Sequence, residues 1–269
     1  MVSTIFLSIL GFVIGAYVIY LLLLFFFQEQ LIFQKVKPNL LSYKKLSPLE
    51  IRLITNDGIT LHGWSTNNHN SSEIHDSTLI YFGGNAQDVS TMLPILEELQ
   101  VKHAYTFNYR GYGLSEGIPS EKNLYADSIE IVNQIKSQHK DTKIILMGHS
   151  LGSAVAGFVA GQTFPSKLIL LCPLHSISKI ATSRYQAPSS FIKHKFSLVK
   201  TAKSIKSPSL VLLAENDSVI PESHSLATIK HLTNNKEAIK IPNCGHNELF
   251  QETETLLTIN RFLTDTKKR

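Results

Sequence analysis

The chain has 269 residues, of which 43% are hydrophobic and 17% are charged, and its formal net charge is +5. This balance excludes an intrinsically disordered chain, and the length suits a single α/β domain. The modest positive charge is compatible with an anionic membrane surface. Because no zinc-finger spacing or aromatic-rich RNP pattern occurs, no nucleic-acid partner is expected. The two cysteines, Cys172 and Cys244, lack CxxC spacing and are expected to be small buried side chains.

The N-terminal segment is uncharged and apolar from Ile5 to Phe27. As a helix rising ~1.5 Å per residue it would be about 34 Å long, enough to cross a hydrocarbon core of ~30 Å. A cleaved signal peptide is the alternative. Against it, Met1–Thr4 carries no positive charge, the apolar run is too long and no A-x-A-like site follows. We therefore predict a transmembrane anchor over residues 1–27 and a linker over residues 28–47.

The orientation of this anchor is predicted from the basic residues around it. Lys35, Lys37, Lys44 and Lys45 follow the apolar run, whereas no Lys or Arg precedes it. The positive-inside rule places the more basic flank in the cytoplasm. We therefore expect a single-pass membrane protein whose large C-terminal part lies on the cytoplasmic side.

Beyond the linker, apolar strand-like runs alternate with helical stretches, which predicts a mostly parallel, eight-stranded sheet flanked by helices over residues 48–269. The predicted strands are Leu49–Thr55, Ile59–Ser65, Leu79–Gly83, Ala104–Tyr109, Lys143–Gly148, Lys167–Cys172, Ser209–Ala214 and Glu237–Ile241. The predicted helices are Ser90–Leu99, Glu121–Gln138, Leu151–Gln162, Glu222–His231 and Glu248–Leu263. Several of these strands are apolar throughout, which is typical of strands buried on both faces.

An insertion at about residues 173–207 interrupts this alternation, and segments at this position commonly form a cap over an active site. A plain surface excursion is the alternative. No Asp or Glu occurs from Thr142 to Ala214. The insertion instead contains Lys179, Arg184, Lys193, Lys195, Lys200, Lys203 and Lys206. We expect this basic cap to contact anionic membrane lipids, with a solvated lysine surface as the equal alternative.

The segment Gly148–Gly152 (GHSLG) fits the G-x-S-x-G pattern, directly after an apolar strand and before a helix of small residues. Glycines on both sides of the serine permit a sharp strand-to-helix turn that exposes its hydroxyl. The N-terminus of the following helix favours developing negative charge. Ser150 is therefore the predicted nucleophile.

A serine nucleophile needs a histidine base, which in turn needs an acid to hold its tautomer, and the chain order in this fold is Ser, acid, His. His246 lies in a glycine-containing loop after the last predicted strand and is the predicted base. The carboxylates between Ser150 and His246 are Glu215, Asp217, Glu222 and Glu237. Asp217, in the loop after the predicted strand Ser209–Ala214, is the predicted acid, and Glu215 is the second choice.

An acyl-transfer site also needs two N–H donors for the oxyanion. Leu151 should supply one and Asn85 the other, with Ala86 as the alternative to Asn85. The Gly-Gly pair before Asn85 could also be only a tight turn. No metal or cofactor is expected, because the histidines lack H-E-x-x-H spacing and no P-loop or complete G-x-G-x-x-G occurs.

Several motifs together resemble the α/β-hydrolase superfamily, and more narrowly the membrane-anchored Bem46-like group, which includes the α/β-hydrolase-domain-containing 13 and 17 enzymes. The motifs are Phe82–Ala86 (FGGNA), Asn108–Gly117 (NYRGYGLSEG), Gly148–Gly152, Asn216–Pro221 (NDSVIP) and Gly245–Asn247 (GHN). Three positions depart from the usual pattern, with Gly83 for histidine, Asn108 for aspartate and Ala214 for glycine. The resemblance implies hydrolysis of an ester, thioester or amide.

The resulting hypothesis is a membrane-anchored serine hydrolase. It would cleave an ester or thioester of an acyl lipid or acylated protein through an acyl-enzyme intermediate at Ser150. The alternative is a catalytically silent, membrane-tethered binding module with the same fold.

Overall fold

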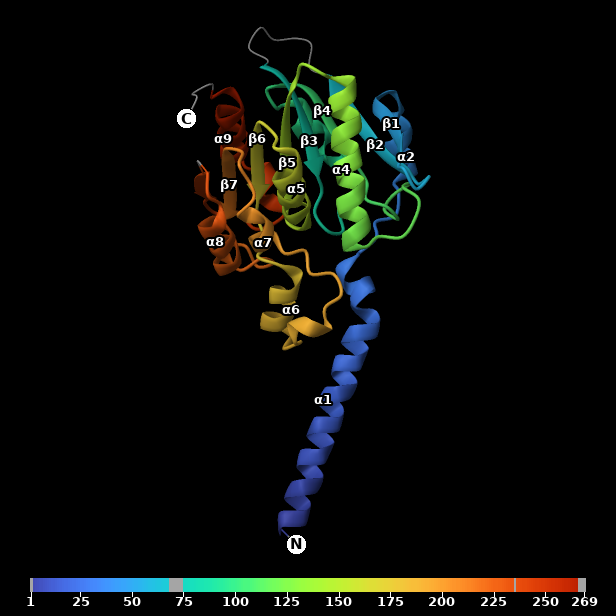
Figure 1. Cartoon of the computed structure of the whole chain (residues 1–269), viewed down its shortest axis with the longest axis vertical. Coiled ribbons are helices and arrows are strands. Elements are labelled where there is room, and N and C mark those ends of the chain that lie inside the picture. The colour runs from blue at the N-terminus through green and yellow to red at the C-terminus, as the bar shows by residue number, and fades with distance from the viewer. Residues whose placement is uncertain (1, 68–74, 235, 266–269) are drawn as a thin grey trace.

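The computed structural model describes residues 2–67, 75–234 and 236–265, so Met1 of the predicted anchor and residues 68–74, 235 and 266–269 of the predicted hydrolase domain lie outside it. Helix α1 (Val2–Ile32) extends from one end of an α/β domain (Figure 1). It continues past the predicted end of the anchor at Phe27. The predicted linker therefore contains the last turn of α1, together with the short helix α2 (Leu40–Lys45).

The described residues form one eight-stranded sheet in the order β1-β2-β4-β3-β5-β6-β7-β8. The strands are β1 (Glu50–Ile54), β2 (Thr60–Asn67), β3 (His75–Phe82), β4 (Val101–Phe107), β5 (Lys143–His149), β6 (Lys167–Leu171), β7 (Ser209–Ala214) and β8 (Lys236–Ile241). β2 pairs antiparallel with both β1 and β4, whereas every pair from β4 to β8 in this order is parallel. The predicted mostly parallel sheet is thus confirmed.

Helices cover both faces of the sheet, as predicted. The helices that follow α2 along the chain are α3 (Leu93–Glu97), α4 (Glu121–Gln138), α5 (Leu151–Thr163), α6 (Ile177–Tyr185), α7 (Leu198–Ala202), α8 (Glu222–His231) and α9 (Thr253–Thr264), of which α6 lies in the insertion beyond the end of the sheet. Alternate residues of β5 show why both faces need cover. Ile144 and Leu146 join a buried cluster with α4 and α5, whereas Ile145 and Met147 join a second cluster with α3 and α9.

The parallel register brings the carboxyl ends of β3, β5, β6, β7 and β8 to one edge of the sheet. Loops that follow these strands therefore meet there, as ligand-binding loops do in open α/β sheets. The insertion after β6 forms α6, the 3₁₀ segment η3 (Ser189–Phe191) and α7. Figure 1 shows α6 at this end of the domain, beside the C-terminal part of α1.

A buried arginine joins three segments next to this edge. Arg110, in the loop after β4, donates Nε to Asp127 of α4 over 2.8 Å and Nη1 to Asp57 of the β1–β2 turn over 2.8 Å. The side chains of Arg110 and Asp127 are each 6% exposed. Because both charges are desolvated, each depends on the other for compensation.

We expect Asp127→Ala to lower the free energy of unfolding by about 3–5 kcal/mol, because it leaves the buried guanidinium partly uncompensated. The exposed pair between Lys102 and Asp76, 3.2 Å apart, provides the control, and Asp76→Ala should leave stability nearly unchanged. Urea unfolding of the full chain in detergent measures both. Equal losses in the two variants would contradict the role assigned to Arg110.

Candidate active site

Ser150 lies in a sharp turn between β5 and α5, with φ 55° and ψ −117°. This conformation is rare for a residue with a side chain. The flanking glycines permit the turn, since a Cβ on Gly148 would collide with Gly152 O and a Cβ on Gly152 with Phe82 O. The Ser150 N–H donates to Leu171 O of β6 over 2.9 Å, which ties the turn to the neighbouring strand.

The structure brings Asp217 and His246 together at the ends of β7 and β8. The distance between Asp217 Oδ2 and His246 Nδ1 is 2.7 Å, and the two side chains are 7% and 6% exposed. Asp217 Oδ1 accepts the N–H groups of Val219 over 2.9 Å and Ile220 over 2.7 Å. Burial alone would raise the pKa of Asp217, but the hydrogen bonds from His246 and Ile220 outweigh it and lower the pKa.

This contact determines what the His246 ring can do. A carboxylate accepts hydrogen bonds, so Nδ1 carries the proton and Nε2 is left as the basic nitrogen. The arrangement is the one that a general base for a serine hydroxyl requires.

The other three carboxylates considered from the sequence have different partners. Glu215 accepts the N–H of Asn243 over 2.9 Å and thereby supports the loop that carries His246. Glu222 pairs with Lys240 over 2.6 Å, and Glu237 pairs with Arg261 over 2.9 Å. Asp217 is thus the carboxylate among the four that bonds to His246.

Ser150 and His246 lie at the same edge, but no hydrogen bond joins them in the described part of the chain. The His246 ring instead lies against the ring of His149, the residue directly before Ser150 in the chain. The two ring centroids are 4.7 Å apart. Hydrogen bonds between a nucleophile and its base are often long in an enzyme without substrate and tighten when substrate binds. The geometry therefore places His246 at the same sheet edge as Ser150, against the residue that precedes Ser150 in the chain, without aligning the two side chains.

The loop after β3 passes beside Ser150, because a Cβ on Gly84 would lie 3.6 Å from Ser150 Cβ. Asn85 Oδ1 accepts the N–H of Gln34 over 3.1 Å and the hydroxyl of Tyr112 over 2.9 Å. These bonds hold Asn85 through its side chain and leave its backbone N–H for another acceptor. Leu151 is the first residue of α5, where backbone N–H groups have no partner within the helix.

In the loop after β3, Gly83 stands where the resembled family has a histidine. Side chains of other residues hold this loop in place. The Tyr109 hydroxyl donates to Gly83 O over 2.8 Å. Gln87 Oε1 accepts both the Gly84 N–H and the Tyr81 hydroxyl, each over 2.8 Å. The substitution at Gly83 therefore leaves a loop with fixed contacts at both glycines.

A cavity of about 250 Å³ lies against Ser150. Asn85, Ser150 and Leu151 line one end, and the cap helix α6 contributes Ile177, Ile180 and Ala181. Part of the wall comes from α1, through Leu24, Gln28, Leu31 and Ile32. The sequence predicted that a cap would cover the site, but not that the anchor helix would line it.

The C-terminal half of α1 is hydrogen-bonded to the cap. The hydroxyls of Tyr17 and Tyr20 donate to Gln186 O over 2.9 Å and Tyr185 O over 2.8 Å. Gln28, only 4% exposed, donates to Phe191 O over 3.2 Å and accepts the Lys193 N–H over 2.7 Å. A signal was present in the sequence, since Tyr17, Tyr20 and Gln28 fall on one face of an otherwise apolar helix.

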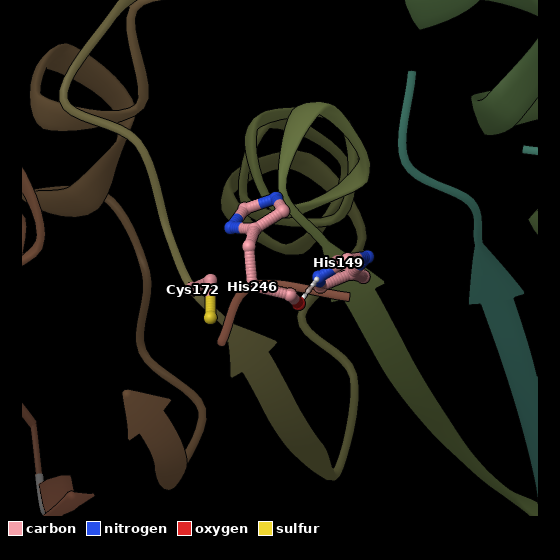
Figure 2. Close-up of side chains that lie close together, drawn as sticks. All are labelled: His149, Cys172 and His246. Atoms are coloured by element: carbon pink, nitrogen blue, oxygen red, sulfur yellow. Dashed lines mark hydrogen bonds between the residues drawn. The ribbon is translucent and has the colours of Figure 1, made fainter. Parts of the chain in front are cut away.

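His149, Cys172 and His246 form a buried cluster whose potential ligand atoms lie within 4.8 Å of one another (Figure 2). The dashed line in Figure 2 joins His149 Nε2 to His246 O over 3.1 Å, and His246 Nδ1 is engaged by Asp217. Burial raises the pKa of the Cys172 thiol well above its usual range, which disfavours the thiolate that binds metals. These contacts fit a support for the His246 loop better than a metal site.

Burial lowers the pKa of His149 to about 3, so the folded chain keeps this ring neutral where an unfolded chain would protonate it below its ordinary pKa of 6.5. His149 therefore contributes stability above pH 6.5 that is lost as the pH falls towards 3. The variant His149→Gln keeps an N–H donor but does not titrate. Between pH 6.5 and pH 4, its free energy of unfolding should therefore fall less steeply than that of the wild type, by up to about 1.4 kcal/mol per pH unit. Urea unfolding at each pH measures this, and parallel curves for the two proteins would exclude it.

Comparison with known proteins identifies relatives along most of the chain. Residues 75–197 match the Hydrolase_4 family, described as serine aminopeptidase, S33. An uncharacterized protein of Mycobacterium tuberculosis is 31% identical over 221 residues, covering 79% of this chain and 78% of that protein. The alpha/beta hydrolase domain-containing protein aho-3 of Caenorhabditis elegans is 30% identical over 191 residues, covering 69% of this chain and 57% of the relative.

Two further matches extend this comparison. The human alpha/beta hydrolase domain-containing protein 17C is 29% identical over 192 residues, covering 70% of this chain and 58% of the relative. The chain thus spans less than two thirds of the length of both domain-containing relatives. Among solved structures, an esterase of Pyrococcus furiosus aligns with a TM-score of 0.66 at 21% identity, over 82% of this chain and 94% of the esterase.

Proposed function

Because the chain belongs to the α/β-hydrolase superfamily, we propose that it is a membrane-anchored serine hydrolase that cleaves an acyl ester or thioester. Hydrolase chemistry follows from the family. The identity of the nucleophile, the class of substrate and the membrane location are what we propose. The observation that carries it is the buried contact of 2.7 Å between Asp217 and His246, at the same sheet edge as the strained turn of Ser150.

The first half of the reaction forms an acyl-enzyme. Ser150 Oγ attacks the carbonyl carbon of the substrate while His246 Nε2 takes the hydroxyl proton, and Asp217 stabilises the imidazolium that results. The N–H groups of Leu151 and Asn85 stabilise the oxyanion. His246 then gives the proton to the departing alcohol or thiol, which leaves Ser150 acylated.

The second half repeats these roles with water. His246 takes a proton from the water molecule, whose oxygen attacks the acyl carbon, and the same two N–H groups stabilise the second oxyanion. Ser150 leaves with the proton from His246, and the product is a carboxylic acid. The apolar cavity beside Ser150 supports an acyl group as the part of the substrate that the site retains.

Helix α1 supports the membrane location. It has 31 residues, is long and apolar enough to span a membrane, and has none of its most apolar 18-residue window buried in the structure. Its contacts with the cap through Tyr17, Tyr20 and Gln28 favour a retained helix over a cleaved signal peptide. The lysines that follow it favour a hydrolase domain on the cytoplasmic side.

A fluorophosphonate probe should label the wild-type chain, and Ser150→Ala should abolish labelling, because the probe reacts with an activated serine. The matched control is Ser153→Ala, one helical turn away, whose Oγ donates to Ser150 O over 2.5 Å. This control should remain labelled. Equal labelling of the wild type and Ser150→Ala would exclude Ser150 as the nucleophile, and a labelled serine without turnover of any acyl ester would favour a silent binding module.

Asp217→Asn should lower kcat on a soluble acyl ester by about 10³–10⁴-fold, because the amide favours the wrong tautomer of His246. Glu215→Gln provides the control, since Glu215 bonds to the loop backbone and not to the ring of His246, and kcat should change by only a few-fold. Steady-state kinetics of the two variants measures this difference. A larger loss in Glu215→Gln than in Asp217→Asn would reassign the acid.

A further inference from the structure

We propose that the cavity beside Ser150 holds a long-chain acyl group that is already seated in the membrane leaflet, and that α1 forms one wall of this acyl site. The inference rests on the proposed hydrolase function, because it assigns the acyl part of that same substrate. It adds a binding role to a helix that otherwise only anchors the chain.

The cavity runs along α1. Ile32, Gln28 and Leu24 line it at intervals of four residues, which places them on one face of the helix. At ~1.5 Å per residue, the distance from Ile32 to Leu24 is about 12 Å. Directly after the helix, the Gln34 N–H bonds to Asn85 Oδ1, so one end of the cavity lies at the proposed oxyanion loop. We call this the serine end and the opposite end, at Leu24, the anchor end.

The anchor end lies beside the proposed membrane span. Leu24 belongs to the apolar run that ends at Phe27, and the next turns of α1 carry the tyrosines that bond to the cap. Tyr20, the partner of Tyr185, is about 10 Å along the helix from Phe27. The tip of the cap therefore lies alongside the apolar segment, at the depth of the acyl chains of one leaflet.

Exposed lining residues show where the cavity opens. At the anchor end, Tyr185 is 45% exposed and the neighbouring Arg184 is also exposed. No hydrogen bond or ion pair engages the Arg184 side chain within the described residues, so it is free to extend towards lipid headgroups. At the serine end, Leu31 is 51% and Val219 is 38% exposed. The cavity thus opens towards the leaflet at one end and towards water at the other.

The size of the cavity limits the part of the chain it encloses. An engineered apolar cavity of roughly 150 Å³ holds benzene, with six carbons, so about 250 Å³ accommodates roughly ten carbons. The wall from α6 is apolar, through Ile177, Ile180 and Ala181. The remaining carbons of a longer chain would leave through the anchor end and stay in the bilayer.

This geometry lets the substrate react without leaving the membrane. The acyl chain lies along α1 in the direction it already has in the leaflet, with its carbonyl carbon at Ser150. Attack by Oγ forms the new C–O bond, and the C–O or C–S bond to the headgroup side breaks. The alcohol or thiol takes the proton from His246 and departs at the serine end, and water then releases the fatty acid.

A pair of variants on adjacent residues of α1 tests the wall. Leu24→Trp should narrow the cavity, whereas Leu23→Trp adds the same side chain at a residue that does not line it and is 53% exposed. The ratio of kcat/KM for p-nitrophenyl decanoate to that for p-nitrophenyl acetate should fall about tenfold or more in Leu24→Trp and stay within about twofold in Leu23→Trp. Leu24→Ala introduces a smaller side chain, so it causes no steric clash that could unfold the protein. It should move the substrate preference to longer acyl chains.

The depth of the cap is tested with tryptophan fluorescence in phosphatidylcholine vesicles that contain lipids brominated in their acyl chains. The natural Trp64 is fully buried and gives a constant background. Tyr185→Trp should add emission that the brominated lipids quench. Phe164→Trp, which replaces a 63% exposed aromatic residue at the opposite edge of the sheet, should add emission that they leave unquenched.

The source of the acyl group is distinguished by offering a phosphatidylcholine ester and an S-palmitoylated peptide in the same vesicles. Turnover of either supports the inference, and the faster one identifies the source. Equal decanoate-to-acetate ratios in Leu24→Trp and Leu23→Trp, or no quenching of Tyr185→Trp, would overturn it. If the wild type instead hydrolyses no ester and Ser150→Ala labels as the wild type does, the proposed function itself fails.

Discussion

The turn between β5 and α5 depends on two glycines that allow backbone atoms to approach more closely than any side chain would permit. A Cβ on Gly148 or Gly152 would collide with the carbonyl of Gly152 or Phe82, and Ser150 itself takes a positive φ of 55°. Such strain persists only when the surrounding structure holds it in place. Here the buried β5 and α5 do so, and the other groups of the site converge on the position that this turn defines.

Convergence follows from the direction of the strands. The loops after β3, β7 and β8 carry Asn85, Asp217 and His246, and they reach the turn because these strands run parallel to β5. Their tips are then held by bonds to neighbouring segments. Asn85 is fixed by Gln34 and Tyr112, and the His246 backbone is fixed by His149.

Two adjacent histidines show how environment separates similar side chains. His149 is enclosed, its pKa falls to about 3, and its ring stays neutral as a structural donor to His246 O. His246 instead has a carboxylate as its side-chain partner, through the contact of Nδ1 with Asp217. A buried ring that bonds only to a backbone carbonyl suits a structural role, whereas a buried ring that bonds to a carboxylate suits proton transfer.

Helix α1 joins two parts of the proposed function that are usually considered separately. Its outer surface is apolar and exposed, as a membrane span requires, while Leu24, Gln28 and Ile32 face the cavity beside Ser150. A free-standing hydrolase domain would lack this wall. The proposed substrate, an acyl group in the leaflet, would be held by the same helix that places the enzyme at the membrane.

By itself the sequence determined the order of strands and helices, because apolar periodicity and turn residues are local signals. The bounds of α4, α8 and β7 match the prediction. The G-x-S-x-G pattern also singled out Ser150, and chain order singled out Asp217 and His246. The structure brings all three to one sheet edge, although their catalytic roles stay predictions. Only the tertiary structure decided that α1 lines the cavity, that Glu215 supports a loop and that Ser150 and His246 are not hydrogen-bonded. These features depend on contacts between segments far apart in sequence, which no local pattern encodes.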